Sequence, residues 1–294
     1  MSYKAEKALS LLGQDFTNKS EEDLKKAFKE VLENGMHGIG FSPYVEGQEP
    51  GDQISEEQIR RRMEIIKPYT KWIRSFSCTD GNELIPKIAK EYGIKTLVGA
   101  WLGTDAEKNE EEIQGLIDAA KAGYVDIAAV GNEVMYRQDL TEEELLGFMA
   151  RVKSEIPDIP VGYVDAYYEF EHRPAITEAC DVILANCYPY WEGCHIDYSF
   201  VYMQQMYNVA VNAAKGKRVI ISEAGWPNKG ETFHGAEPSE ANALKYFINA
   251  QLWSENDDIE MFYFSSFDES WKTGSEGDVG AFWGIWDKDE NLKY

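Results

Sequence analysis

The chain has 294 residues, with 52 acidic and 29 basic side chains and a formal net charge of -23 at pH 7. A charge of that sign repels phosphate backbones and anionic lipid surfaces, so it argues against nucleic-acid binding and membrane-surface roles and favours a neutral partner. Hydrophobic residues make up 44% of the sequence, and the length suits one α/β barrel. We therefore expect a single domain over residues 1–294.

Residues 1–35 precede the first predicted strand and form an N-terminal helical extension. Its helical stretch, residues 23–33, is expected to be an extra helix that closes the bottom of the barrel. The segment Met1 to Lys7 shows no basic stretch followed by a long apolar one, and no window of the sequence approaches a membrane span. As written, the chain looks cytoplasmic. A trimmed form of a periplasmic or secreted protein would look the same, so the compartment stays open.

Eight apolar, β-branched or glycine-rich runs recur along the chain and are typical of strands buried on both faces. They cover residues 36–41, 72–77, 95–101, 125–131, 159–164, 181–186, 218–222 and 261–266. Helix start signals lie between them: capping boxes begin at Ser55 and Thr141, and Pro238-Ser239-Glu240 opens another helix. This alternation predicts an α/β fold, a (β/α)8 TIM barrel, with a short C-terminal tail over the rim. An open doubly wound sheet is disfavoured because no GxGxxG turn follows the first run.

Two glutamates stand where predicted strands end. Glu133 follows the fourth strand in Val130-Gly131-Asn132-Glu133, and Glu223 closes the seventh in Ser222-Glu223-Ala224-Gly225-Trp226-Pro227. In a TIM barrel both project from the same rim, where two carboxyl groups about 5 to 5.5 Å apart cleave a glycosidic bond with retention. An ionised Glu223 would raise the pKa of Glu133, which makes Glu133 the proton donor and Glu223 the nucleophile. Asn132 is expected to bind the sugar 2-hydroxyl.

Each motif is weak by itself, since a glutamate after a strand often only caps the next helix. The two glutamates together, on the fourth and seventh strands, are a stronger signal of a glycosidase site. No metal or cofactor is expected, because His37, His172, His195 and His234 include no close pair. No Gly-x-Ser-x-Gly elbow indicates a serine hydrolase. The four cysteines, Cys78, Cys180, Cys187 and Cys194, are expected to be buried free thiols.

At the two glutamate motifs and at Phe267-Asp268-Glu269-Ser270-Trp271-Lys272, the chain resembles glycoside hydrolase family 17, the β-1,3-glucanases and glucanosyltransferases, and in particular its bacterial laminarin-degrading members. The resemblance implies that Glu133 is the acid/base, that Glu223 is the nucleophile and that Glu269 and Lys272 form an auxiliary pair. It also implies that Tyr44, Asn132 and Tyr188 line the subsite where the bond breaks. Trp226 and Trp271 follow the seventh and eighth strands and are expected to be further sugar contacts, since aromatics beside glycine or proline in loops, such as Trp226, are better sugar platforms than aromatics inside strands. The family often carries a further acid just before the aromatic-Gly pair of the tail, but here that segment reads Gly280-Ala281-Phe282-Trp283-Gly284, which leaves Glu276 or Asp278 as substitutes.

The predicted function is retaining, endo-acting hydrolysis of β-1,3-glucosidic bonds in laminarin-like glucan, through a covalent glycosyl-enzyme intermediate and by a monomer. The same site could instead transfer glucanosyl units or act as an exo-β-1,3-glucosidase. An exo mode requires a wall at one end of the cleft, for which residues 191–199 or the tail are candidates. A non-catalytic glucan-binding barrel is a remote alternative, because both glutamates are present.

Overall fold

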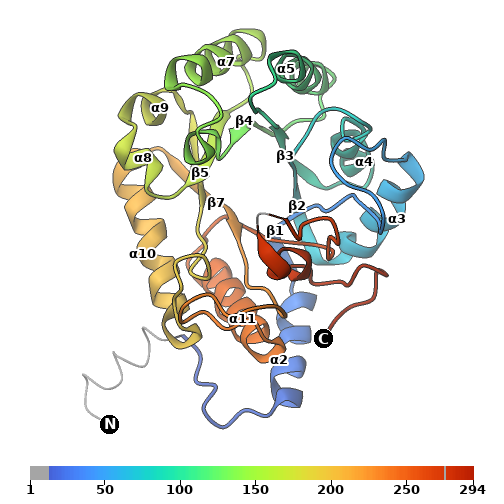
Figure 1. The fold of residues 1–294 in the computed structure, drawn as a ribbon, viewed down its shortest axis with the longest axis vertical. Helices are drawn as coiled ribbons and strands as arrows, with labels where there is room; N and C mark the ends of the chain where they lie inside the picture. The colour runs from blue at the N-terminus through green and yellow to red at the C-terminus, as the bar shows by residue number, and fades with distance from the viewer. Residues whose placement is uncertain (1–12, 275) are drawn as a thin grey trace.

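The computed structural model describes residues 13–274 and 276–294, in which eight parallel strands close into a barrel in sequential order (Figure 1). The predicted (β/α)8 barrel is confirmed, and every predicted run contains a strand. The largest difference is at the eighth strand, which ends at Tyr263. The strands are β1 (Met36–Gly40), β2 (Thr70–Ser75), β3 (Lys95–Ala100), β4 (Ile127–Asn132), β5 (Val161–Ala166), β6 (Val182–Asn186), β7 (Arg218–Ala224) and β8 (Met261–Tyr263).

Helices surround the barrel (Figure 1), and the predicted start signals are confirmed. Ser55 and Thr141 form capping boxes at α3 and α7, and the Ser239 side chain accepts a hydrogen bond from the Asn242 amide at the start of α11. The helices are α2 (Glu21–Glu33), α3 (Glu56–Ile66), α4 (Leu84–Glu91), α5 (Ala106–Lys121), α6 (Val134–Arg137), α7 (Glu142–Glu155), α8 (Glu169–His172), α9 (Pro174–Ala179), α10 (Ile196–Ala214) and α11 (Glu240–Asn256), with 3-10 turns η1 (Lys67–Tyr69) and η2 (Gly277–Phe282).

The N-terminal extra helix exists, but the prediction that it closes the barrel bottom is wrong. Helix α2 runs alongside α11: Lys25 Nζ lies 2.5 Å from Glu240 Oε1, and the rings of Phe28 and Phe247 are 4.6 Å apart. Because β8 is followed by the tail and η2 rather than by a long helix, α2 takes the last place in the outer layer. Residues 1–12 of the predicted extension lie outside the described residues.

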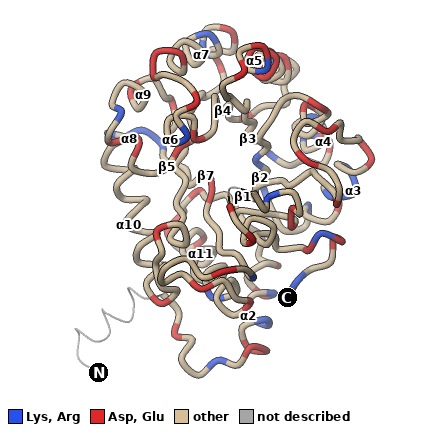
Figure 2. The backbone as a smooth tube through the Cα atoms, viewed as in Figure 1, with Lys and Arg blue, Asp and Glu red and all other residues tan. Residues whose placement is uncertain are grey.

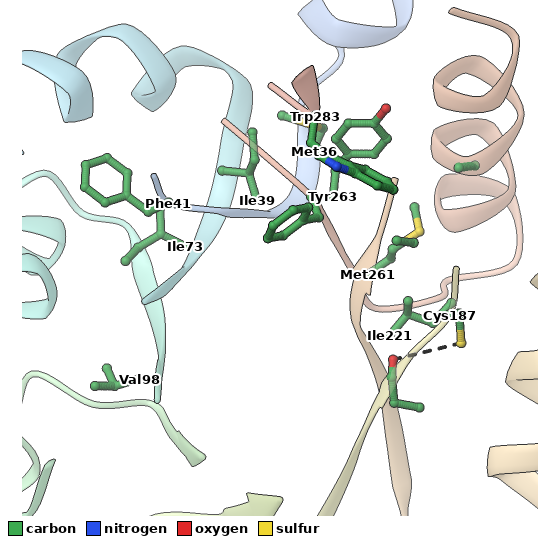
Figure 3. Packing of buried hydrophobic residues seen from close by; sticks show 14 of the residues in the cluster. Met36, Ile39, Phe41, Ile73, Val98, Cys187, Ile221, Met261, Tyr263 and Trp283 are labelled. Carbon is green, nitrogen blue, oxygen red and sulfur yellow. Dashed lines mark hydrogen bonds between the residues drawn. The ribbon is translucent and has the colours of Figure 1, made fainter. Parts of the chain in front are cut away.

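The core has two parts. One fills the barrel interior and consists of Trp72, Leu97, Ile127, Ala129, Val164, Val182, Leu184, Ile220 and Phe262. The other lies between the strands and the helices, and Figure 3 shows part of it, including Met36, Ile39, Ile221 and Met261. Gly38 makes room for the interior ring of Phe262, because a Cβ at residue 38 would lie only 2.5 Å from that ring. The interior is therefore filled up to the layer below the C-terminal rim.

The C-terminal tail folds back over the rim, as predicted. Trp286 bridges to Phe267 and to Leu292. The carboxylate of Asp268 holds the tail, accepting hydrogen bonds from the Gly284 amide at 2.8 Å and from Lys293 Nζ at 3.0 Å. This packing places residues 264–274 and 276–284 beside the mouth of the barrel.

Charged residues lie mainly on the outer helices and the connecting loops, where acidic segments predominate (Figure 2). Within the described residues, no helix combines the length and apolar character that crossing a membrane requires. Cys78, Cys180 and Cys187 are buried free thiols, as predicted, and Cys194 is a half-buried free thiol.

Candidate active site

The two predicted glutamates lie at the C-terminal ends of β4 and β7, where the strand register shifts. The register changes between Ala129 and Asn132 along the β4–β5 pair, and near Glu223 along the β6–β7 pair. Such irregularities re-aim side chains at a barrel rim. Gly131 has φ 83°, which favours glycine, and Glu133 itself has φ 52°. The backbone therefore turns sharply where it carries Glu133.

Glu223 lies in an environment suited to an anion. Arg74 Nη1 donates to Glu223 Oε1 at 2.6 Å, and the Tyr188 hydroxyl donates to Oε2 at 2.5 Å. Burial and the nearby Glu223 charge raise the pKa of Tyr188 well above its ordinary value, so its hydroxyl remains a donor. Two short hydrogen bonds, one from a cation and one from a hydroxyl, fix the orientation of this buried carboxylate and complement a negative charge on it.

Glu133 lies in the opposite kind of environment. Its carboxyl accepts a 2.8 Å hydrogen bond from the neutral amide of Asn186. Burial, followed by the charge of Glu223, raises the pKa of Glu133 from 4.5 to about 7. The hydrogen bond from Asn186 and the more distant charge of Arg137 oppose that rise. Glu133 is therefore mostly protonated below about pH 7, as a general acid must be where it acts.

Side chains also join the two glutamates. Arg74 Nη2 donates to Asn132 Oδ1 at 2.6 Å, which leaves the amide nitrogen of Asn132 as a donor for a ligand. On the other side, Ser222 Oγ donates to Asn186 Oδ1 at 2.8 Å, and Asn186 donates in turn to Glu133. This network fixes both carboxyl groups relative to one another.

The predicted auxiliary pair is formed at the start of the tail. Lys272 Nζ lies 3.0 Å from Glu269 Oε2, and it stands over the Phe264 ring at 4.2 Å. Burial lowers the pKa of Lys272, but Glu269 and Glu276 outweigh that effect and raise it above its ordinary value. Trp271 Nε1 donates to Glu269 Oε1 at 3.3 Å. The pair thus joins a half-buried cation to a buried carboxyl group, and the charge of Glu223 also acts on Lys272.

A model of the BtgE/BtgC glycoside hydrolase domain matches residues 38–284. The chain belongs to this family. A glucan 1,3-beta-glucosidase of Saccharomyces cerevisiae is 28% identical over 269 residues, covering 82% of this chain and 85% of the relative. A crystal structure of a glycoside hydrolase family 17 beta-1,3-glucanosyltransferase from Rhizomucor miehei has a TM-score of 0.79 and 28% identity, covering 89% of this chain and 96% of that one. The resemblance to glycoside hydrolase family 17 is thereby confirmed.

In this glycoside hydrolase the missing tail acid has a candidate substitute. The pKa of Glu276 is raised by burial and lowered by Lys272, while Glu223 and Glu269 raise it further, so its carboxyl belongs to the same cluster of charges. Asp278 instead accepts a hydrogen bond from the Glu231 amide at 2.9 Å and is exposed. Of the two substitutes, Glu276 is the one whose charge interacts with Glu223.

The structure gathers most of the predicted sugar contacts and corrects one. Tyr44 lies beside Trp271, with ring centroids 5.9 Å apart, and its hydroxyl accepts a hydrogen bond from Asn82. Trp226, by contrast, is only 1% exposed, and its Nε1 donates to the Glu237 carbonyl at 3.0 Å. The prediction that Trp226 binds substrate is therefore wrong. Its Gly-Trp-Pro setting suggested a loop platform, but the ring packs under the rim.

Two residues of the hydrolase site were not among the predicted ones. Arg74 binds both Glu223 and Asn132, and Asn186 binds Glu133. The signal for Arg74 was a charged residue inside an otherwise apolar strand, because a buried arginine requires a partner. Asn186 stood at the end of a predicted strand, in the position where functional groups of this fold cluster.

Aromatic side chains extend the rim on both sides of the glutamates. Trp101 and Tyr136 are 41% and 59% exposed, on the side of Glu133. On the side of Glu223, Trp283 packs against Tyr188 with ring centroids 5.4 Å apart. Beyond it lies a cavity of about 320 Å³ lined by Tyr190, Trp191, Glu231, Thr232, Phe233, Glu276, Gly277, Asp278 and Val279. No group of three or more potential metal ligands was found across residues 13–274 and 276–294.

Proposed function

We propose that the protein hydrolyses β-1,3-glucosidic bonds within laminarin-like glucan, with retention of anomeric configuration. One observation carries the proposal: the paired glutamates have opposite surroundings, with a cation and a hydroxyl at Glu223 and burial with a neutral amide at Glu133. A retaining glycosidase needs this difference, because one carboxyl group must be ionised while the other is protonated. The names of the family relatives support the linkage that we assign.

In the first step, the ionised oxygen of Glu223 attacks the anomeric carbon while Glu133 donates its proton to the departing sugar oxygen. The amide nitrogen of Asn132, oriented by Arg74, is placed to donate to the 2-hydroxyl as positive charge develops. Once Glu133 is ionised, it takes a proton from water, which hydrolyses the ester at Glu223. Tyr188 and Arg74 restrain the nucleophile throughout.

Transfer to a second sugar is the alternative, and the likeness to the Rhizomucor miehei glucanosyltransferase favours it specifically. Both reactions share the covalent intermediate and differ in whether water or a sugar hydroxyl attacks it. The exposed Trp101 and Tyr136 on the acid/base side are the rings that an acceptor sugar would meet. We give hydrolysis first place, and product analysis separates the two.

The test is incubation with laminarin and a defined series of β-1,3-gluco-oligosaccharides, with products resolved over time. Endo hydrolysis releases internal fragments of several lengths early, exo action releases one small product from the start, and transfer yields products longer than the substrate. Early products analysed for anomeric form should retain the β configuration. Initial inversion, or full activity in a Glu223→Gln variant, would rule out the proposed mechanism.

A further inference from the structure

The backbone conformation of Glu133 requires support from its neighbours. A non-glycine residue with φ 52° costs on the order of 1 kcal/mol, and it persists only where the surroundings enforce it. The short helix α6 begins directly after Glu133, and the backbone amides of Met135 and Tyr136 lie in its first turn, where an amide has no partner within the helix. The groups that bind these amides therefore decide where the Glu133 carboxyl points.

Two side chains of β5 bind the backbone amides of Met135 and Tyr136. The Met135 amide donates to the Tyr163 hydroxyl at 2.9 Å, and the Tyr136 amide donates to Asp165 Oδ2 at 3.3 Å. The Tyr163 hydroxyl in turn donates to Asp165 Oδ2. Tyr163 is 1% exposed and Asp165 is fully buried. A buried aspartate and tyrosine thus bind one another and the turn that follows the acid/base.

We propose that Tyr163 and Asp165 are positioning residues that hold the Glu133 turn in the geometry needed for proton donation to the leaving group. This inference rests on the proposed function. Neither side chain needs to touch the sugar, because both act through the backbone of residues 135 and 136. Misplacing a general acid by about 1 Å costs on the order of 100-fold in rate. A shift of this turn would therefore lower the rate of glycosidic bond cleavage.

Several charged groups face this cluster. Burial raises the pKa of Asp165 to about 6, while its hydrogen bonds from Tyr163 and backbone amides oppose that rise and Glu169 of α8 adds to it. Glu169 is itself paired with Arg173 at 2.7 Å. The pKa of Glu133 is raised by the charges of Glu223 on β7 and Asp165 on β5, and it is lowered by the charge of Arg137 on α6. Removal of the Asp165 charge is therefore expected to lower the pKa of Glu133.

The experiment compares Tyr163→Phe and Asp165→Asn with the parent protein on two substrates. One is a β-1,3-gluco-oligosaccharide, whose departing sugar needs a proton. The other is a 2,4-dinitrophenyl β-glycoside of the same sugar, whose departing phenolate needs none. Both variants should lose about 10- to 100-fold in kcat/KM on the oligosaccharide and less than about 3-fold in the release of dinitrophenolate. Asp165→Asn should also shift the alkaline limb of the oligosaccharide profile to lower pH.

Asp126→Asn is the matched control. Asp126 also accepts a backbone hydrogen bond, from the Thr96 amide at 2.7 Å, but it lies at the N-terminal end of β4. This variant should lose thermal stability with no change in the ratio of the two substrate activities. Equal losses on both substrates in Tyr163→Phe, or an unchanged ratio in both β5 variants, would overturn the inference. If the parent protein cleaves neither substrate, the proposed function fails first, and that result is distinct.

Discussion

Replacing Glu133 by glutamine tests the assignment of the proton donor and the physical cause behind it. Glutamine keeps the side-chain shape and an oxygen for the Asn186 amide, but it carries no proton to donate. General acid catalysis typically contributes about 100- to 10,000-fold, so we expect kcat on a β-1,3-gluco-oligosaccharide to fall by that order. In the parent protein, kcat/KM on the same substrate should decline above about pH 7, because burial and Glu223 raise the Glu133 pKa to about 7.

The Glu133→Gln variant should also differ from the parent protein in how its free energy of unfolding depends on pH. Because the pKa of Glu133 rises from 4.5 to about 7 on folding, its contribution to the free energy of unfolding is complete below pH 4.5 and is lost as pH rises through 7. The loss amounts to about 3 kcal/mol. Glu133→Gln has no such dependence, so relative to the parent protein it should gain about 3 kcal/mol between pH 4 and pH 8.

Thermal melts of the two proteins across that pH range provide the measurement. At roughly 2 °C per kcal/mol for a chain of this size, the difference in Tm should change by about 6 °C in favour of the variant as pH rises. Other buried acids titrate in both proteins and largely cancel in the difference. A difference in Tm that stays constant from pH 4 to pH 8 would refute the argument that Glu133 is protonated in the folded protein.

Four further variants test the site and the barrel. Arg74→Met should lower the free energy of unfolding by about 3 to 5 kcal/mol in denaturant titrations, since it leaves a buried carboxylate unpaired; an unchanged midpoint would contradict the role of the ion pair. Trp271→Ala should raise KM for oligosaccharides, whereas Trp226→Phe should lower Tm and leave KM unchanged; the reverse pattern would restore Trp226 as a sugar contact. Gly38→Ala should cost about 1 to 3 kcal/mol through its clash with Phe262, without altering the pH profile of the activity that remains; a variant as stable as the parent would show that the interior can repack.

The sequence was sufficient for features that depend on local patterns. Apolar runs located all eight strands, serine and threonine capping boxes located two helix starts, and the position of Glu133 and Glu223 at strand ends placed both on one rim. Features that depend on neighbours far apart in the sequence could not be predicted from the sequence. Trp226 is buried because it packs against Tyr190 and Tyr246, which lie elsewhere in the chain. The place of α2 depended on which element followed β8.

The least predictable feature is also the one that separates the roles of the two glutamates. Arg74 comes from β2, 149 positions away from the carboxylate that it binds. One nitrogen of its guanidinium donates a hydrogen bond to Glu223, and the other donates to Asn132, the residue directly before Glu133. The cation therefore stabilises a negative charge on Glu223, the proposed nucleophile, while a neutral amide from β6 binds Glu133, the proposed acid. Had the guanidinium bound Glu133 instead, it would have lowered the pKa of Glu133, and no proton would be available on that carboxyl group for the leaving sugar at neutral pH.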